Sequence, residues 1–223
     1  MGNRTRHERN RTGDGEGYPP RVALEDAWNE HSRYVGFAAG LFAVGIAIGI
    51  GLMAAGYNLL EIIENVVGEP LFPDISEQSK LELARFLLVN NSRAFVLSIL
   101  GVLSLGLLTA WAMLFNGVIV GNIGAFVATD AGVGYILVGL LPHGIFELPA
   151  LFVAAGVGFR LLYRVGQRIR GGRNAVFSKA YLYRTGILVV VAWLLLVVAA
   201  FVEAFVTPVL LETLFSEQLQ AAS

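Results

Sequence analysis

A histidine and a glutamate stand four residues apart in the stretch LLPHGIFELPA, which covers residues 140–150. The two residues are His143 and Glu147, and they lie between Pro142 and Pro149. Residues four apart share one face of a helix, so the imidazole can donate a hydrogen bond to the carboxylate. The same spacing would let both side chains bind one metal ion or relay a proton. Long apolar runs flank this stretch, so its polar groups need a partner or a function.

Three interpretations of this pair can be compared on their chemistry. A zinc enzyme needs about three protein ligands and an open position, and the His-Glu-x-x-His motif of zincins is absent. His7 and His31 are the other histidines, so a site would combine His143 and Glu147 with Glu203 or Asp130 and be poor in nitrogen. No serine lies close in sequence to His143 for a hydrolase. We therefore expect a structural lock, in which a protonated His143 lies between Glu147 and Glu203, with no catalytic residue, metal or cofactor.

Composition indicates what surrounds these groups. The chain has 223 residues, of which 56% are hydrophobic and 15% are charged, and its mean hydropathy is +0.66. Several apolar runs exceed the roughly 18 residues that a membrane-spanning helix needs. The net charge of −1 gives no basic surface for nucleic acid, and the absence of cysteine excludes disulfides and thiolate ligands. The sequence thus predicts a polytopic membrane protein whose first partner is the lipid bilayer.

Five spans are predicted, and each must be helical because backbone groups in hydrocarbon have to pair internally. The fold class is therefore an all-α bundle of five transmembrane helices. We expect a disordered cytoplasmic tail over residues 1–33, a five-span domain over 34–210 and a short external tail over 211–223. The predicted spans run from Tyr34 to Leu60, Ala94 to Phe115, Gly117 to Leu141, Gly144 to Tyr163 and Gly186 to Pro208.

The basic residues predict the orientation in the cell membrane. Six arginines precede Tyr34 and seven Lys or Arg lie between Arg160 and Arg184, whereas the segment from Tyr57 to Arg93 has three basic residues and six acids. Cytoplasmic loops carry the excess of Lys and Arg, which places the N-terminus inside and the C-terminus outside. Within the acidic segment, Asp74 and Glu77 have capping-box spacing and predict an amphipathic external helix over residues 74–88.

Small residues recur at helical spacing and predict close helix packing. Such ridges serve packing within one chain or a homo-oligomer, and the sequence favours neither. Among the polar residues of the spans, Asp130 falls near the middle of the third and suggests a break there. Asn116 and Asn122 flank the inner half of the same span. The ridges are Gly36, Gly40, Gly45 and Gly49 in the first span, Gly117, Gly121, Gly124, Ala128 and Gly132 in the third, and Ala150, Ala154 and Gly158 in the fourth.

Four stretches resemble the stage II sporulation protein M family. The most characteristic are FNGVIVGNIGAF, with Asn116 and Gly117, and LLPHGIFELPALFVAAGVGFRL, with Pro142, His143, Gly144 and Glu147. NNSRAF at 90–95 and AAFVEAFVTP at 199–208, with Glu203, are also similar. The resemblance extends from Val35 to Pro208 and implies a membrane protein with five spans.

The resemblance also implies a function. The family's namesake is similar to a membrane anchor that gathers a lytic transglycosylase and an amidase during spore engulfment. We therefore expect a non-catalytic scaffold for membrane or external protein partners. A transporter, or the membrane subunit of a transport complex, is the alternative, because polar groups and a proline inside spans are typical of discontinuous transporter helices. An intramembrane metal-dependent hydrolase ranks third.

The spans predict where the polar residues meet. Counted from the outer ends of the fourth and fifth spans, Glu147 and Glu203 lie at about the same depth, near 6–7 Å at a rise of 1.5 Å per residue. We expect them to form one polar cluster with His143 near the outer face, with Asp130 as the next candidate partner.

Overall fold

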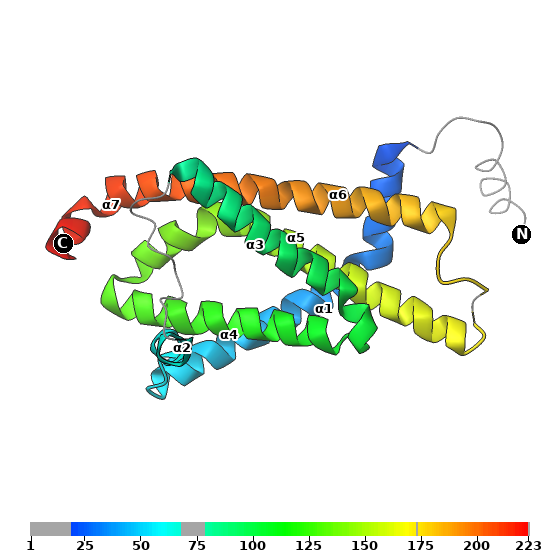
Figure 1. The fold of residues 1–223 in the computed structure, drawn as a ribbon, viewed down its shortest axis with the longest axis horizontal. Helices are drawn as coiled ribbons and strands as arrows, with labels where there is room; N and C mark the ends of the chain where they lie inside the picture. The colour runs from blue at the N-terminus through cyan, green and yellow to red at the C-terminus, as the bar shows by residue number, and fades with distance from the viewer. Residues whose placement is uncertain (1–18, 68–78, 173, 223) are drawn as a thin grey trace, which may run out of the picture.

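The computed structural model describes residues 19–67, 79–172 and 174–222, and this part of the chain is helical (Figure 1). Two short irregular helices interrupt the sequence of α-helices: η1 is a 3₁₀-helix and η2 is a π-helix. The elements are α1 (Pro20–Ala54), α2 (Leu59–Val67), α3 (Lys80–Leu100), η1 (Gly101–Ser104), α4 (Leu107–Asp130), α5 (Val133–Ile169), α6 (Lys179–Phe201), η2 (Val202–Val206) and α7 (Thr207–Ala222).

Five helices of the described residues are long and apolar enough to cross a membrane. This confirms the predicted all-α bundle with five spans. The helical segments that meet both criteria are Pro20–Ala54, Lys80–Ser104, Leu107–Asp130, Val133–Ile169 and Lys179–Ser216.

Helix α5 is the centre of the bundle and packs against α1, α3, α4, α6 and α7 (Figure 1). Small residues make this possible, because Ala150, Ala154 and Gly158 are buried and let neighbouring backbones approach. A Cβ at Gly158 would lie 2.5 Å from the carbonyl oxygen of Ser98 in α3. The predicted ridge of the fourth span is thus a packing surface within one chain. The main core adds Phe95 of α3 and Leu188, Ala192 and Leu196 of α6.

Helices α1 and α4 form the closest contact in the bundle. Gly45 and Gly49 of α1 face Gly117 and Gly121 of α4, and a Cβ at any of them would overlap a backbone carbonyl of the other helix. Without side chains between them, the two backbones gain dispersion contacts that lipid cannot replace. The expected ridge of the third span is therefore only partly correct, because a Cβ at Gly124 would make just an ordinary contact with Ile136.

The boundary between the second and third spans differs from the prediction. The chain turns at η1 and the following Leu105 and Gly106, which have positive φ angles of 55° and 79°. Asn116 and Gly117, which stand at the predicted boundary between these spans, lie inside α4. An Asn-Gly pair favours turns in water. Inside a membrane, backbone groups must form their hydrogen bonds within the protein, which favours a continuous helix at this pair. The glycine is used there for packing against α1.

The N-terminal boundary of the first span was also placed too late. Residues 20–33, expected in the disordered tail, are helical, and Ala23, Ala27 and His31 are fully buried. Pro20 suits the first turn of a helix, where its missing N–H has no role. Packing against other helices stabilises this part of α1, which composition alone does not reveal. Residues 1–18 of the predicted tail lie outside the described residues.

The short C-terminal tail expected over residues 211–223 is helical as far as Ala222, as part of α7. Phe215 of α7 packs edge-on against Tyr135 of α5, with ring centroids 5.3 Å apart. The external amphipathic helix expected over 74–88 is not a separate element within the described residues, because Lys80 begins the long α3. Its capping box is formed by Ser79 and Glu82, whereas Asp74 and Glu77 lie outside the described residues.

Candidate functional site

Three side chains, two from α5 and one from η2, come together inside the bundle. They are His143, Glu147 and Glu203, and one nitrogen or oxygen ligand atom of each lies within 4.8 Å of the others. We call these three residues the His-Glu-Glu cluster. Asn91 of α3 faces the Glu147 carboxylate as a hydrogen-bond donor. The cluster therefore lies where α3, α5 and η2 meet.

His143 is the most enclosed member of the cluster. Its side chain is 8% exposed, and its Nδ1 atom is buried without a hydrogen-bond partner. The lock expected from the sequence is thus not formed through this nitrogen. A buried polar atom without a partner costs about 1–3 kcal/mol, so binding a ligand or a proton at this nitrogen would be favourable.

The two helical segments that carry the cluster, α5 and η2, are both irregular beside it. Pro142 and Pro149 lie inside α5, where each removes a backbone donor and frees the carbonyl four residues earlier. The predicted start of the fourth span at Gly144 is wrong, because α5 begins at Val133 and runs through both prolines. Glu203 lies in the π-helix η2, which α5 and α3 both contact. Single π-turns inside α-helices occur frequently at functional sites, because they redirect a side chain.

The cluster lies deeper along the helices than the sequence predicted. Glu147 follows the first residue of α5, Val133, by fourteen positions, or about 21 Å along the helix. The prediction placed it one turn from the end of its span. The difference arises because the helix continues through Pro142 and Gly144, where the predicted third span ends and the fourth begins.

The remaining residues proposed from sequence lie apart from the cluster or serve packing. Asp130 is exposed at the last position of α4, so its charge is not in the middle of a span. Asn116 is half-buried in α4, and Gly117 packs against α1. Gly144 is buried next to His143, but a Cβ there would meet Leu140 at 4.0 Å, an ordinary contact rather than a close approach.

Asn122 of α4 holds the end of α1 in place. Its fully buried amide donates to the carbonyl oxygens of Gly49, at 3.2 Å, and Tyr57, at 2.8 Å. Its Oδ1 accepts from the backbone N–H of Leu59 at 2.8 Å. These bonds satisfy backbone groups where α1 ends and α2 begins, which is a structural role.

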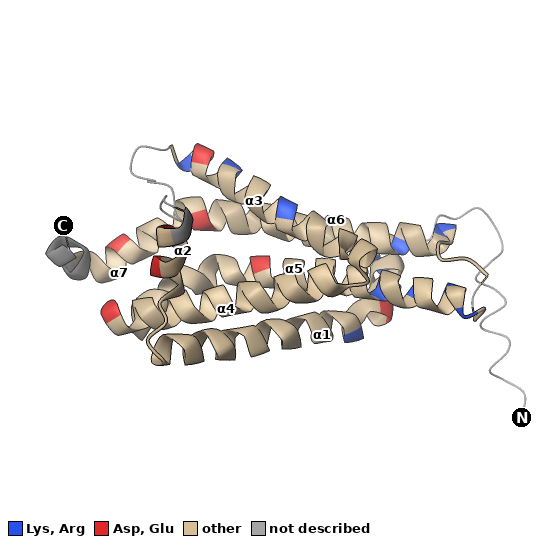
Figure 2. Ribbon diagram, turned by 60° about the horizontal axis from the view of Figure 1, so that its bottom comes forward, with Lys and Arg blue, Asp and Glu red and all other residues tan. Residues whose placement is uncertain are grey.

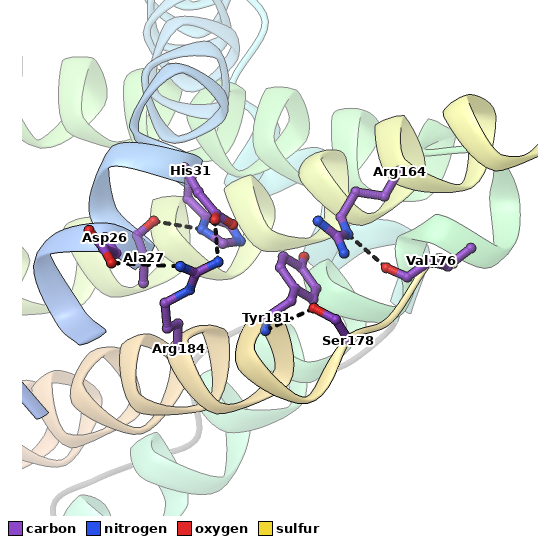
Figure 3. A network of polar contacts seen from close by, with 9 residues as sticks. Asp26, Ala27, His31, Arg164, Val176, Ser178, Tyr181 and Arg184 are labelled. Carbon is purple, nitrogen blue, oxygen red and sulfur yellow. Dashed lines mark hydrogen bonds and ion pairs between the residues drawn. The ribbon is translucent and has the colours of Figure 1, made fainter. Parts of the chain in front are cut away.

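A second polar network lies near the other end of the bundle, where α1 crosses α6 (Figure 3). Arg184 of α6 pairs with Glu30 at 2.6 Å and with Asp26 at 3.6 Å, both in α1. The Nδ1 atom of His31 bonds to the carbonyl oxygen of Ala27 at 2.7 Å, and its ring stacks on Tyr181. Neither α1 acid was predicted to have a partner, because both fell in the expected tail.

The same network continues to the loop between α5 and α6 (Figure 3). The guanidinium of Arg164 lies 3.6 Å from the centroid of the Tyr181 ring, and its Nε donates to the carbonyl oxygen of Val176 at 2.8 Å. A cation over an aromatic face is stabilised by the ring quadrupole, more so where water is excluded. Arg164 is 4% exposed, so this contact fixes the loop to the bundle.

The two polar regions differ in what they can do chemically. The network around Arg184 balances cations with acids and packs helices together. The His-Glu-Glu cluster has two carboxylates, and among the described residues neither forms an ion pair with Lys or Arg. Such a cluster is suited to bind a cation or protons.

Comparison with known proteins gives a family but no related fold. The family model described as stage II sporulation protein M matches residues 38–208. An uncharacterized protein of Methanocaldococcus jannaschii is 32% identical over 123 residues, which cover 55% of this chain and 69% of the relative. No solved structure matches. The matched family region includes every member of the His-Glu-Glu cluster.

Proposed function

The chain belongs to the stage II sporulation protein M family, and from this we propose that it is a non-catalytic membrane scaffold that holds partner proteins at the bilayer. The observation that supports this proposal best is an apolar groove between α1, α5 and α6. The groove has a volume of about 390 Å³, and its only charged lining residue is Glu25. Its lining is Leu24, Glu25, Trp28, Pro149, Val153, Leu188, Val191, Ala192 and Leu195.

The groove suits a membrane helix of a partner. Trp28 lines the groove with 48% of its surface exposed, and large aromatic side chains are enriched where proteins bind each other. Ala192 and Pro149 leave room for an approaching helix. Membrane helices associate through such shape-matched contacts, because lipid tails are as apolar as the side chains. Cell-wall-remodelling enzymes, or membrane proteins that hold them, are the partners that the resemblance implies.

Site-specific photo-crosslinking in native membranes tests the scaffold proposal. A photoreactive amino acid replaces Val191 in the groove, and a matched one replaces Trp111, which is exposed on α4. We expect a partner protein, identified by mass spectrometry, to crosslink at Val191 and not at Trp111. This partner should also lose its membrane localisation when the gene for this chain is deleted. Crosslinking to lipid alone at Val191 would contradict the proposal.

Transport is the second candidate, and one observation favours it. The proline-containing part of α5 and the π-helix η2 adjoin the same polar cluster, as in discontinuous helices of transporters. Purified protein in liposomes should then show flux that Glu147→Gln and Glu203→Gln abolish. Equal flux in protein-free liposomes would exclude this function.

A further inference from the structure

We propose that the His-Glu-Glu cluster binds one divalent transition-metal ion, of the zinc or manganese type, through His143, Glu147 and Glu203. The ligand atoms of these residues already lie within 4.8 Å of one another. An ion at the centre of a triangle with 4.8 Å sides would lie about 2.8 Å from each donor, whereas zinc ligands lie at roughly 2.0–2.2 Å. Each donor would need to move by under about 1 Å, which side-chain torsions provide.

The unpaired nitrogen of His143 is independent support for a ligand. The side chain is more than nine-tenths buried, and its Nδ1 has no hydrogen-bond partner. Metal-bound histidines use one ring nitrogen for the ion and leave the other for a hydrogen bond. An ion in the cluster would bind one ring nitrogen of this buried imidazole.

Charge also favours a divalent ion. Two carboxylates meet among apolar helices, and within the described residues no Lys or Arg pairs with either. A charged side chain in the middle of a membrane helix is costly, so such a group usually pairs with another charge or marks a functional site. One divalent cation would neutralise both carboxylates at once, whereas a protonated histidine would neutralise only one.

The donor types narrow the choice of ion. An imidazole nitrogen suits zinc, iron, copper and nickel, and carboxylates also suit manganese, whereas magnesium and calcium prefer oxygen donors alone. Three protein ligands leave a fourth position open for water or another ligand. Asn91, which faces Glu147, supports the ligand from the neighbouring helix α3.

Metal analysis of the full chain tests the proposal. The protein is purified in detergent with a tag free of histidine, equilibrated with Zn²⁺ and desalted, and its metal content is measured by mass spectrometry. We expect about one ion per chain in the unchanged protein and under about 0.1 in Glu147→Gln/Glu203→Gln, which retains side-chain volume but loses both anionic ligands. Glu61→Gln/Glu212→Gln removes two exposed carboxylates and should bind as the unchanged protein does.

Two further measurements keep the result independent of folding. His143→Gln removes the nitrogen ligand and should also lose the ion, while Asn91→Ala should bind about tenfold more weakly. Bound Co²⁺ should give visible absorption bands in the unchanged protein that are absent from His143→Gln. Gel filtration shows which variants remain folded.

The opposite results are equally clear. Metal content that is the same in the unchanged protein and in both site variants would mean binding elsewhere on the surface. A metal-free unchanged protein, with a double Gln variant that melts at the same or a higher temperature, would mean that protons neutralise the carboxylates. Either result overturns the metal site and leaves the scaffold proposal untouched.

Discussion

At the scale of single residues, Asn91 and Glu147 are the informative pair, since they join two helices beside the cluster. Asn91→Ala removes the donor that faces the carboxylate and leaves it less well satisfied. We expect a loss of about 1–3 kcal/mol in the free energy of unfolding. Thermal melting in detergent measures this effect. Asn90→Ala changes the exposed neighbour and is the matched control; equal melting temperatures for both variants would contradict the interaction.

Sequence reasoning found all three members of the cluster but not their surroundings. His143 and Glu147 stand out by their spacing, and Glu203 stands out as a charge in an apolar run. Asn91 belongs to the NNSRAF stretch that resembles the family, but nothing in that stretch links it to Glu147, because its amide is uncharged and its neighbour is another asparagine. Asp130 was given too much weight, because a carboxylate in an apolar run looks buried until the end of its helix is known.

At the scale of helices, the contact between α1 and α4 makes a sharp prediction. Gly117→Ala places a Cβ against the carbonyl oxygen of Phe42, so the helices must separate. We expect a lower yield and a loss of about 1–3 kcal/mol, the cost of overpacking a core. Gly124→Ala on the same helix is the control, since its Cβ would have room at 3.9 Å from Ile136. Unfolding in detergent compares the two, and similar losses would contradict this packing.

The Arg184 ion pairs make a second prediction at this scale. Side chains of Arg184, Asp26 and Glu30 are 23–35% exposed, so solvent screens the pairs only in part. Arg184→Ala should loosen the first turns of α1 from α6, and amide hydrogen exchange should rise over residues 20–31. Arg21→Ala breaks the exposed pair with Glu25 and should leave exchange there nearly unchanged. Unaltered exchange in Arg184→Ala would show that buried alanines alone hold this segment.

Helix boundaries were less predictable than the number of spans. The count of five depends on the total length of apolar sequence, because the bilayer thickness fixes how many apolar residues one span needs. The ends depend on local turns, and the turn at residues 101–106 is almost as apolar as the helices that it joins. Hydropathy therefore cannot separate α3 from α4. The π-helix η2 had no sequence signal either, because its five residues resemble those of α6.

At the scale of the whole molecule, the distribution of charge predicts the orientation. Lys and Arg concentrate at the end of the bundle that holds the loop between α5 and α6, and the middle of the helices is nearly free of them (Figure 2). Cytoplasmic ends of membrane proteins carry this excess. The N-terminus and residues 170–178 are therefore predicted to be cytoplasmic, and α2 and the C-terminus external.

Cysteine labelling checks this orientation directly, because the chain has no native cysteine. Asn65→Cys in α2 and Asn174→Cys in the α5–α6 loop are both exposed positions. An impermeant maleimide should label Asn65→Cys in intact cells and Asn174→Cys only after permeabilisation. Labelling in the reverse order would mean that the protein has the opposite orientation.

The glycine contact between α1 and α4 also has a consequence for biosynthesis. Gly45 and Gly117 are 72 residues apart, and α3 is synthesised between them. If α1 enters the bilayer as it is synthesised, its glycine face is covered only by lipid or an insertion factor until α4 leaves the ribosome. During that interval α3 is the nearest helix available, yet it must not occupy the face that α4 will use. The order in which the ribosome releases the helices thus differs from the order in which they pack in the bundle.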